Sequence, residues 1–450
     1  KTYEVLLDIY DEIVDRYLIP NGMDSFHVGL DEVWDGLAQN ADEIFKNRSP
    51  WCKCPDCREV SRKKLFRDHA IKLLNHLKGR GMKNIYMYSD MLLRPGEDPG
   101  AVDNTQEMIQ ALKDNDLVDI VVIDWWTYSD FKDKLMYQTT RPELGFRRTV
   151  KPWNGYYHWT VLSNPLRNIY LLGEIANKEG VEGMQSYSAW DESYDRNHIC
   201  QADYSWNFEG AGSIKCVTDR YVERNFGAQY DKARRAFELI DLVTEQRNEK
   251  YEDGTPVLSK YGILLSTLSY YFYSYVREGK PYPRIFPGEP LSTINADRVN
   301  YLREINEIAS MSKEASALLS EVAADPRCNT KMAKRFLYEV ENYLCLAEDY
   351  LALFKMIDLA DACDGEYCNC VIEEIKCLAL ERKLARLALM TRLEETKEEF
   401  LMASHMRNQS IFMQFFADLE GYLANTETED VKLDFYDMRY LESEAFKKLR

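Results

Sequence analysis

The sequence predicts an α/β fold with a parallel sheet, followed by a mainly α-helical region. Up to about residue 215, short runs rich in β-branched and aromatic residues alternate with helical patterns. From about Thr218 onward, apolar residues recur at helical spacing almost throughout. Strands that alternate with helices at this spacing are typical of repeated βα units. We therefore expect one domain over residues 1–215 and an all-α domain over residues 216–450.

Five segments of the first region have the composition and length of strands. They are Ser25–Leu30, Asn84–Tyr88, Asp119–Asp124, Arg148–Lys151 running on towards Tyr157, and Gly183–Ser188. Helical patterns separate several of them, over residues 61–79, 104–115 and 164–180. A helix between two strands provides the crossover that a parallel pair needs, so the five strands are expected to form one parallel sheet.

The second region carries long apolar stripes at helical spacing. One stripe includes Phe336, Val340, Tyr343, Ala347, Tyr350, Phe354 and Ile357. The Pro-rich stretch 281–287 interrupts the helical pattern once. Stripes of this kind are typical of core packing in a helical bundle.

The charge of the chain excludes several classes of partner. Lys and Arg number 57 and Asp and Glu 75, which gives a formal net charge of −18. Binding to nucleic acid or to an anionic membrane requires clustered positive charge, so neither partner is expected. The sequence also has no apolar run of the length that a membrane span needs.

Two adjacent carboxylates, Asp31 and Glu32, directly follow the first predicted strand. In a barrel of βα units, side chains at the carboxyl ends of the strands form the active site. Two neighbouring carboxyl groups can shift each other's pKa apart, which leaves one ionised and one protonated for acid-catalysed bond cleavage. Taken alone, the dipeptide fits two solvated acids at the start of a helix better than a catalytic pair.

The wider segment His27-Val28-Gly29-Leu30-Asp31-Glu32 resembles the His-x-Gly-x-Asp-Glu signature of glycoside hydrolase family 20, the β-N-acetylhexosaminidases. Leu30 stands where that family usually has Gly or another small residue. Later segments resemble the ends of the family's next strands in order, although Tyr88 replaces the usual Trp. These segments are 88–92, 124–126, 155–159 and 183–192.

The resemblance implies a (β/α)8 barrel of the TIM type, of which this chain carries strands four to eight. We expect the first three strands, and the Arg that follows the first one, to lie outside these 450 residues. The resemblance covers roughly residues 1–210.

The resemblance also implies a mechanism in which the 2-acetamido group of the substrate attacks its own anomeric carbon. Glu32 would be the general acid and base, and Asp31 would orient the acetamide nitrogen. His27 would support the strand end. Tyr157 or Tyr156 would bind the acetamide oxygen; strand alternation leaves the choice between them open. The other implied substrate-binding residues are Trp125, Trp126 and Trp190 around the acetyl group, and Glu192 and Asp90 at the sugar hydroxyls. No cofactor is expected for catalysis.

Two other functions fit the sequence. The departures at Leu30 and Tyr88 also fit a relative that binds sugars without cleaving them. The long helical half also fits an interaction protein built on a hydrolase-like scaffold.

Three cysteines, Cys52, Cys54 and Cys57, lie within six residues of one another. Three thiolates at this spacing can reach one tetrahedral metal, and Zn²⁺ is the usual choice. A structural zinc site is therefore one interpretation, with three unlinked or oxidised thiols as the alternative. The sequence shows no evident fourth ligand; Cys200, a water molecule or a more distant His could supply it. The total of 11 cysteines is odd and the chain is too long to need disulfides, which favours a reducing, cytoplasmic location over a secreted one.

Overall fold

The computed structural model describes residues 2–31, 52, 54–89, 105–127, 139–155, 164–188, 194–244, 260, 295–363, 365–396, 402–436 and 441. The chain divides into two compact units. The first contains residues 1–154, 165–187 and 200–212, and the second contains 155–164, 188–199 and 213–450. The two units are described separately below.

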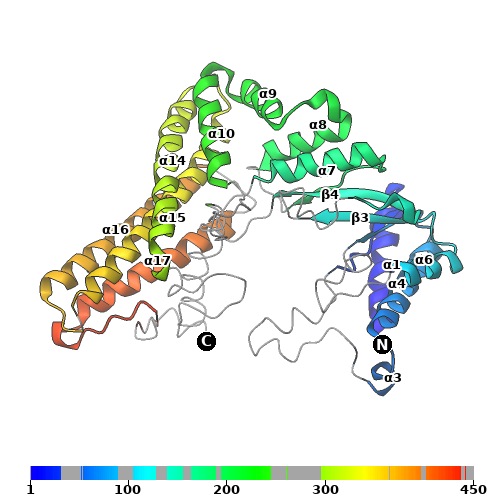
Figure 1. The fold of residues 1–450 in the computed structure, drawn as a ribbon, viewed down its shortest axis with the longest axis horizontal. Helices are drawn as coiled ribbons and strands as arrows, with labels where there is room; N and C mark the ends of the chain where they lie inside the picture. Colours follow the sequence, from blue (N-terminus) through cyan, green and yellow to red (C-terminus); the bar gives the residue numbers. More distant parts are fainter. Residues whose placement is uncertain are drawn as a thin grey trace. The chain divides into compact units, whose positions relative to one another are not determined.

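The first unit is built around a parallel sheet, with the strands in the order β1-β2-β3-β4-β5 (Figure 1). Parallel pairing joins β1 to β2, β2 to β3 and β3 to β4. The bounds are β1 (Ser25–His27), β2 (Asn84–Tyr88), β3 (Val121–Thr127), β4 (Arg147–Gly155) and β5 (Tyr187–Ser188). The predicted parallel sheet is thus confirmed. Among the described residues the sheet has five strands, so the closed (β/α)8 barrel stays a prediction.

Helices precede, connect and follow these strands. Helix α1 (Thr2–Ile13) comes before β1, and α8 (Asp195–Ala211), which extends across both units, comes after β5. The helices between strands are α3 (Pro55–Arg58), α4 (Arg62–Gly79), α6 (Thr105–Asp114) and α7 (Leu166–Glu179). Short π and 3₁₀ turns follow α1 at Val14–Leu18 and Ile19–Asn21, and another precedes β4 at Pro142–Leu144. Helix α4 begins where the sequence indicates, because the Ser61 hydroxyl accepts a hydrogen bond from the Lys64 amide at 3.3 Å and caps the first turn.

The sheet has two faces of different chemistry, because successive side chains of a strand point to opposite sides. One face belongs to a buried apolar core with the helices; it includes Phe26, Ile85, Met87, Val121, Ile123, Trp125 and Val150, packed with Ala70, Leu74 and Leu77 of α4. The register places Tyr88 beside Asp124, Asp124 beside Thr149, and Trp126 beside Lys151 on the other face. These polar side chains therefore lie on the sheet face opposite the apolar core.

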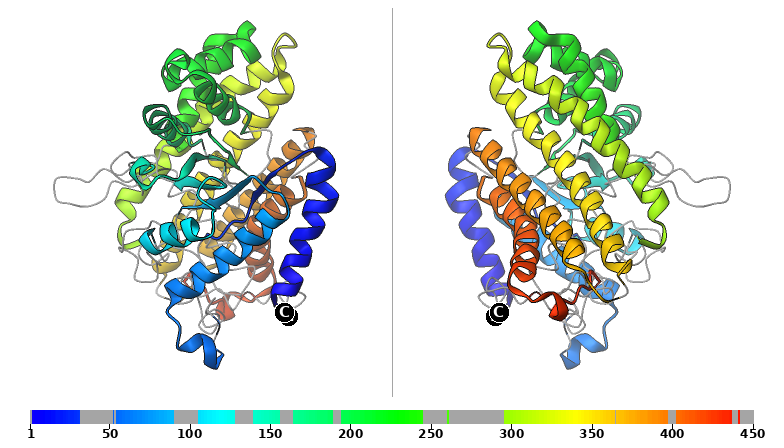
Figure 2. Two further views of the ribbon diagram at one scale, coloured as in Figure 1. Left: turned by 90° about the vertical axis from the view of Figure 1, so that its right-hand side faces the viewer. Right: turned by 90° about the vertical axis from the view of Figure 1, so that its left-hand side faces the viewer.

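The second unit is helical in its described part. Its helices are α9 (Ile214–Phe226), α10 (Tyr230–Thr244), α14 (Arg298–Ala324), α15 (Thr330–Asp361), α16 (Asn369–Thr396) and α17 (Met402–Asn425). Each of the last five packs against its neighbour along the chain (Figures 1 and 2). The predicted stripe on α15 is buried, which confirms its role as bundle core. The Pro-rich stretch 281–287 lies outside the described residues.

Two smaller features complete the description of the fold. A disulfide joins Cys368 to Cys370 at the start of α16. No helix in the described part of the chain combines the length and the apolarity needed to cross a bilayer.

Candidate functional site

His27 ends β1, and its ring is held by hydrogen bonds on both sides. The Gly29 amide donates to Nδ1 at 3.0 Å, so Nδ1 is the acceptor nitrogen. The proton of a neutral imidazole then lies on Nε2, which is 3.3 Å from Asp124 Oδ2. The main chain two residues beyond His27 therefore fixes the tautomer and aims the ring N–H at β3.

Asp124 is a fully buried carboxylate in the middle of β3. Thr149 Oγ1 donates to its Oδ1 at 2.9 Å, and Lys151 Nζ lies 2.8 Å from its Oδ2. Burial by itself would raise the pKa of Asp124, but the His27 hydrogen bond and the charge of Lys151 outweigh it, and the pKa is lowered below its ordinary value. Asp124 is thus the ionised centre of a charge pair that spans β3 and β4.

Two aromatic rings flank this charge pair. The Tyr88 ring centroid lies 4.5 Å from that of His27, and Lys151 Nζ lies 4.6 Å from the Tyr88 centroid. Trp126 meets Tyr88 edge to face at 6.2 Å. We call His27, Tyr88, Asp124, Trp126, Thr149 and Lys151 the strand-end cluster. It joins four neighbouring strands on the sheet face opposite the apolar core that packs against α4.

Asp31 follows this cluster through a tight turn. Gly29 and Leu30 both have left-handed backbone conformations, with φ of 73° and 70°. A methyl group placed on Gly29 would lie 3.6 Å from Asp31 Oδ1, so the exposed carboxylate folds back over the turn. The left-handed region explains why a small residue suits position 30, because a Cβ there costs about 1–2 kcal/mol. Leu30 carries that strain next to the proposed catalytic pair, where such strain often accompanies function.

Replacing Gly29 by Ala should lower the free energy of unfolding by about 1–2 kcal/mol, because Ala would have to adopt the left-handed conformation. Urea denaturation of the full chain measures the effect. Gly79→Ala is the matched control, since a Cβ at Gly79 meets open space and its φ is not positive. We expect the free energy of unfolding of this control to be unchanged or raised by up to about 1 kcal/mol. Equal midpoints for the two variants would refute the role given to Gly29.

The structure separates the two tryptophans that were expected to wall one acetyl pocket. Trp125 is buried in the helix-side core, whereas Trp126 lies on the opposite face with Tyr88. The expectation that they line one pocket together is not met, because adjacent residues of a strand point to opposite faces. The remaining predicted residues, Glu32, Asp90, Tyr157, Trp190 and Glu192, lie outside the described residues.

Sequence reasoning assigned no role to Asp124, Thr149 or Lys151. The sequence nevertheless contains a signal for the two charged residues, because they lie in predicted strands. Buried parallel strands are usually near-continuous apolar runs, and a charged residue within one needs a partner of opposite charge. Asp124 in β3 and Lys151 in β4 are such residues, and both are buried. Their pairing depends on the strand register, which the sequence alone does not provide.

The three clustered cysteines come together in space. The sulfur atoms of Cys52, Cys54 and Cys57 all lie within 4.8 Å of one another. Cys54 caps α3, and its sulfur accepts a hydrogen bond from the Cys57 amide at 3.4 Å. That hydrogen bond, together with those from the neighbouring thiols, lowers the pKa of Cys54. The loop therefore brings three potential sulfur ligands within reach of one ion.

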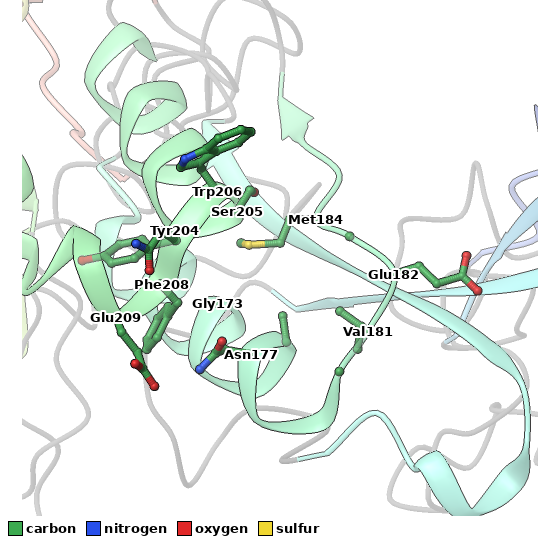
Figure 3. A pocket seen from close by; sticks show the side chains of 14 residues that line it. Gly173, Asn177, Val181, Glu182, Met184, Tyr204, Ser205, Trp206, Phe208 and Glu209 are labelled. Atoms are coloured by element: carbon green, nitrogen blue, oxygen red, sulfur yellow. The ribbon is translucent and has the colours of Figure 1, made fainter.

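A separate pocket of about 510 Å³ lies on the helix side of the first unit (Figure 3). Its lining comes from α7, from residues 180–184 and from the end of α8. The side chain of Trp206 at its edge is 92% exposed. Residues 182 and 183 hydrogen-bond to the early part of β4, through Arg148 and Val150. The pocket thus adjoins the beginning of that strand and is distinct from the strand-end cluster.

Comparisons with known proteins give structural likenesses but no match in sequence. No family model and no curated protein matches the sequence. Among solved structures, the fold is similar to a "GH138 enzyme targeting pectin rhamnogalacturonan II", with 12% sequence identity and a TM-score of 0.44. The match covers 81% of this chain and 66% of that one, so this chain spans slightly less than two thirds of its neighbour's length.

Proposed function

We propose that this chain is a glycoside hydrolase that removes β-linked N-acetylhexosamine by substrate-assisted, retaining catalysis. One observation carries the proposal. Asp31 lies at the carboxyl end of β1, in a parallel sheet, and follows that strand through a strained turn. The Gly29 amide in this turn also fixes the orientation of the His27 ring. Carboxyl ends of parallel strands are where βα folds hold their active sites. The sequence resemblance to family 20 at residues 27–32 supports the finer assignment.

In the proposed first step, the carbonyl oxygen of the 2-acetamido group attacks the anomeric carbon as the bond to the leaving oxygen breaks. Glu32 gives its proton to that oxygen, and the sugar becomes an oxazolinium ion. In the second step Glu32 takes a proton from water, the water oxygen bonds to the anomeric carbon, and the acetamido group is released. Asp31 accepts a hydrogen bond from the acetamide N–H and stabilises the positive charge that develops on the acetamido group.

The strand-end cluster would form the floor of this site. Its Asp124–Lys151 pair is buried and neutral overall, so it holds Tyr88 and His27 in place without adding net charge beneath the substrate. Trp126 contributes an apolar surface on the same face. Tyr157, Trp190, Glu192 and Asp90 are proposed to complete the acetyl pocket and the contacts to sugar hydroxyls.

Kinetics of the full chain test the acid–base role. Glu32→Gln should lower kcat/KM for β-N-acetylglucosaminides and β-N-acetylgalactosaminides by about 10²–10⁴-fold, the usual contribution of a general acid or base. The loss should be greater for an alkyl glycoside than for a nitrophenyl glycoside, because a poor leaving oxygen needs its proton more. Glu59→Gln, at an exposed acid just beyond α3, is the matched control and should leave kcat/KM unchanged.

Two outcomes would contradict the proposal. If the parent chain binds N-acetylglucosamine but cleaves none of these glycosides, the protein is a sugar-binding relative. If the Glu32→Gln variant cleaves both the alkyl and the nitrophenyl glycoside as fast as the parent does, another residue supplies the proton.

A further inference from the structure

The loop that holds Cys52, Cys54 and Cys57 has the geometry of a metal site. Its three sulfur atoms lie within 4.8 Å of one another. Zn–S bonds of about 2.3 Å at tetrahedral angles place sulfur atoms roughly 3.8 Å apart. The separations of the three sulfurs therefore exceed the one that a zinc ion requires by at most about 1 Å.

Main-chain hydrogen bonds shape the loop, and one of its backbone amides is directed at a sulfur atom. The Arg58 amide donates to the Cys54 carbonyl at 3.1 Å, and the Val60 amide donates to the Cys57 carbonyl at 3.2 Å. The Cys57 amide points at Cys54 Sγ. An N–H group directed at a sulfur stabilises the thiolate form, which is the form that binds metal.

The loop contributes little to its own stability. Helix α3 is only four residues long and buries none of them. Isolated helices of this length are not stable in water, because the cost of the first turn is not repaid. A metal crosslink between Cys52, the cap residue Cys54 and Cys57 of α3 would stabilise the turn where apolar packing does not.

We propose that Cys52, Cys54 and Cys57 bind one Zn²⁺ ion as thiolates, with water or a solute molecule as the fourth ligand. Each thiol loses a proton on binding, so three protons are released for each ion bound. Thiolates favour Zn²⁺ or Cu⁺ over the oxygen-preferring Mg²⁺ and Ca²⁺. Within the described ranges no further His, Cys, Asp or Glu joins the three sulfurs.

The position of the site gives it a structural role. In the sequence it lies between the Asp31–Glu32 pair and α4, in the connection that follows β1. The ion would link Cys52 to Cys54 and Cys57 at the start of α3. Because it binds through sulfur and takes no part in the proposed hydrolysis, its presence can be tested independently of the enzyme activity.

Metal analysis of the full chain tests the proposal. The protein is purified under reducing conditions, stripped with a chelator, and loaded separately with Zn²⁺ and with Co²⁺. We expect one zinc per chain by elemental analysis, and for cobalt the charge-transfer and d–d absorption of a tetrahedral thiolate site. Changing all three cysteines to Ser should abolish both signals. Cys216→Ser, at an exposed cysteine of α9, is the matched control and should leave both signals intact.

Two results would overturn the proposal. They are the absence of stoichiometric zinc from the loaded parent and equal zinc binding by the triple-serine chain. The cysteines are exposed or half-exposed, so the triple substitution does not enter the core. Circular dichroism of the variant confirms that it is folded.

Discussion

Replacing Asp124 by Asn is expected to lower the free energy of unfolding by about 3–5 kcal/mol, the usual cost of leaving a buried charge without its partner. Lys151 is only 7% exposed and its Nζ lies 2.8 Å from the Asp124 carboxylate. The variant therefore keeps a buried ammonium group but removes the negative charge that offsets its desolvation. Urea denaturation of the full chain, followed by a signal that reports unfolding of the first unit, measures the loss.

The double variant Asp124→Asn/Lys151→Met is the control for this prediction. It removes both charges, so it should lose less stability than the sum of the two single variants. Additive losses would show that the two charges do not act as a pair. A loss below about 1 kcal/mol for Asp124→Asn would contradict the prediction, because it would show that the pair contributes no more than an exposed ion pair does.

The same carboxylate predicts a dependence on pH. The folded pKa of Asp124 is lowered, so its contribution to stability is present above the unfolded pKa of about 3.9 and is lost as the pH falls through the folded pKa. The stability difference between parent and Asp124→Asn should stay constant from neutral pH to about pH 4 and should narrow only below it. A difference that already narrows between pH 7 and pH 5 would contradict the lowered pKa.

The second large effect is expected in the helical unit. Asp349 of α15 is fully buried between two arginines of α16: Arg382 Nε donates to it at 2.7 Å and Arg386 Nε at 2.9 Å. Asp349→Asn removes the carboxylate that pairs with the buried Arg386 guanidinium, and it leaves Arg382 with the more exposed Glu348, 2.8 Å away. We expect the free energy of unfolding to fall by about 3–5 kcal/mol.

Asp358→Asn provides a matched control on the same helix. Asp358 pairs with Arg298, but its side chain is 58% exposed. Exposed ion pairs contribute about 0–1 kcal/mol, so this variant should unfold close to the parent. Similar losses for the two variants would show that burial does not set the strength of the Asp349 contacts.

The strands and their directions could be predicted because local composition and helix spacing determine them. The structure has strands within or beside all five predicted segments, and Asn84–Tyr88 has the predicted bounds. Helix α8 (Asp195–Ala211) was not predicted. Its apolar residues form no continuous stripe, and the backbone at Asn207 is non-helical. A helix without an amphipathic pattern offers no periodic signal.

The site could be predicted only in part, because it depends on contacts between strands. The position of Asp31 at a strand end follows from sequence order. The pairing of His27 with Asp124 joins residues 97 positions apart, and that of Asp124 with Lys151 joins β3 to β4. These contacts are set by the strand register, as is the division of Trp125 and Trp126 between the two faces.

The most direct test of substrate-assisted hydrolysis is the ratio of kcat/KM for two matched substrates, an aryl β-N-acetylglucosaminide and the aryl β-glucoside that lacks the acetamido group. The account predicts that the full chain cleaves the first, and cleaves the second more slowly by at least about 10³-fold, because a well-placed intramolecular nucleophile supplies a high effective concentration. Comparable rates on both substrates would contradict it, because the glucoside has no acetamido group to act as the nucleophile.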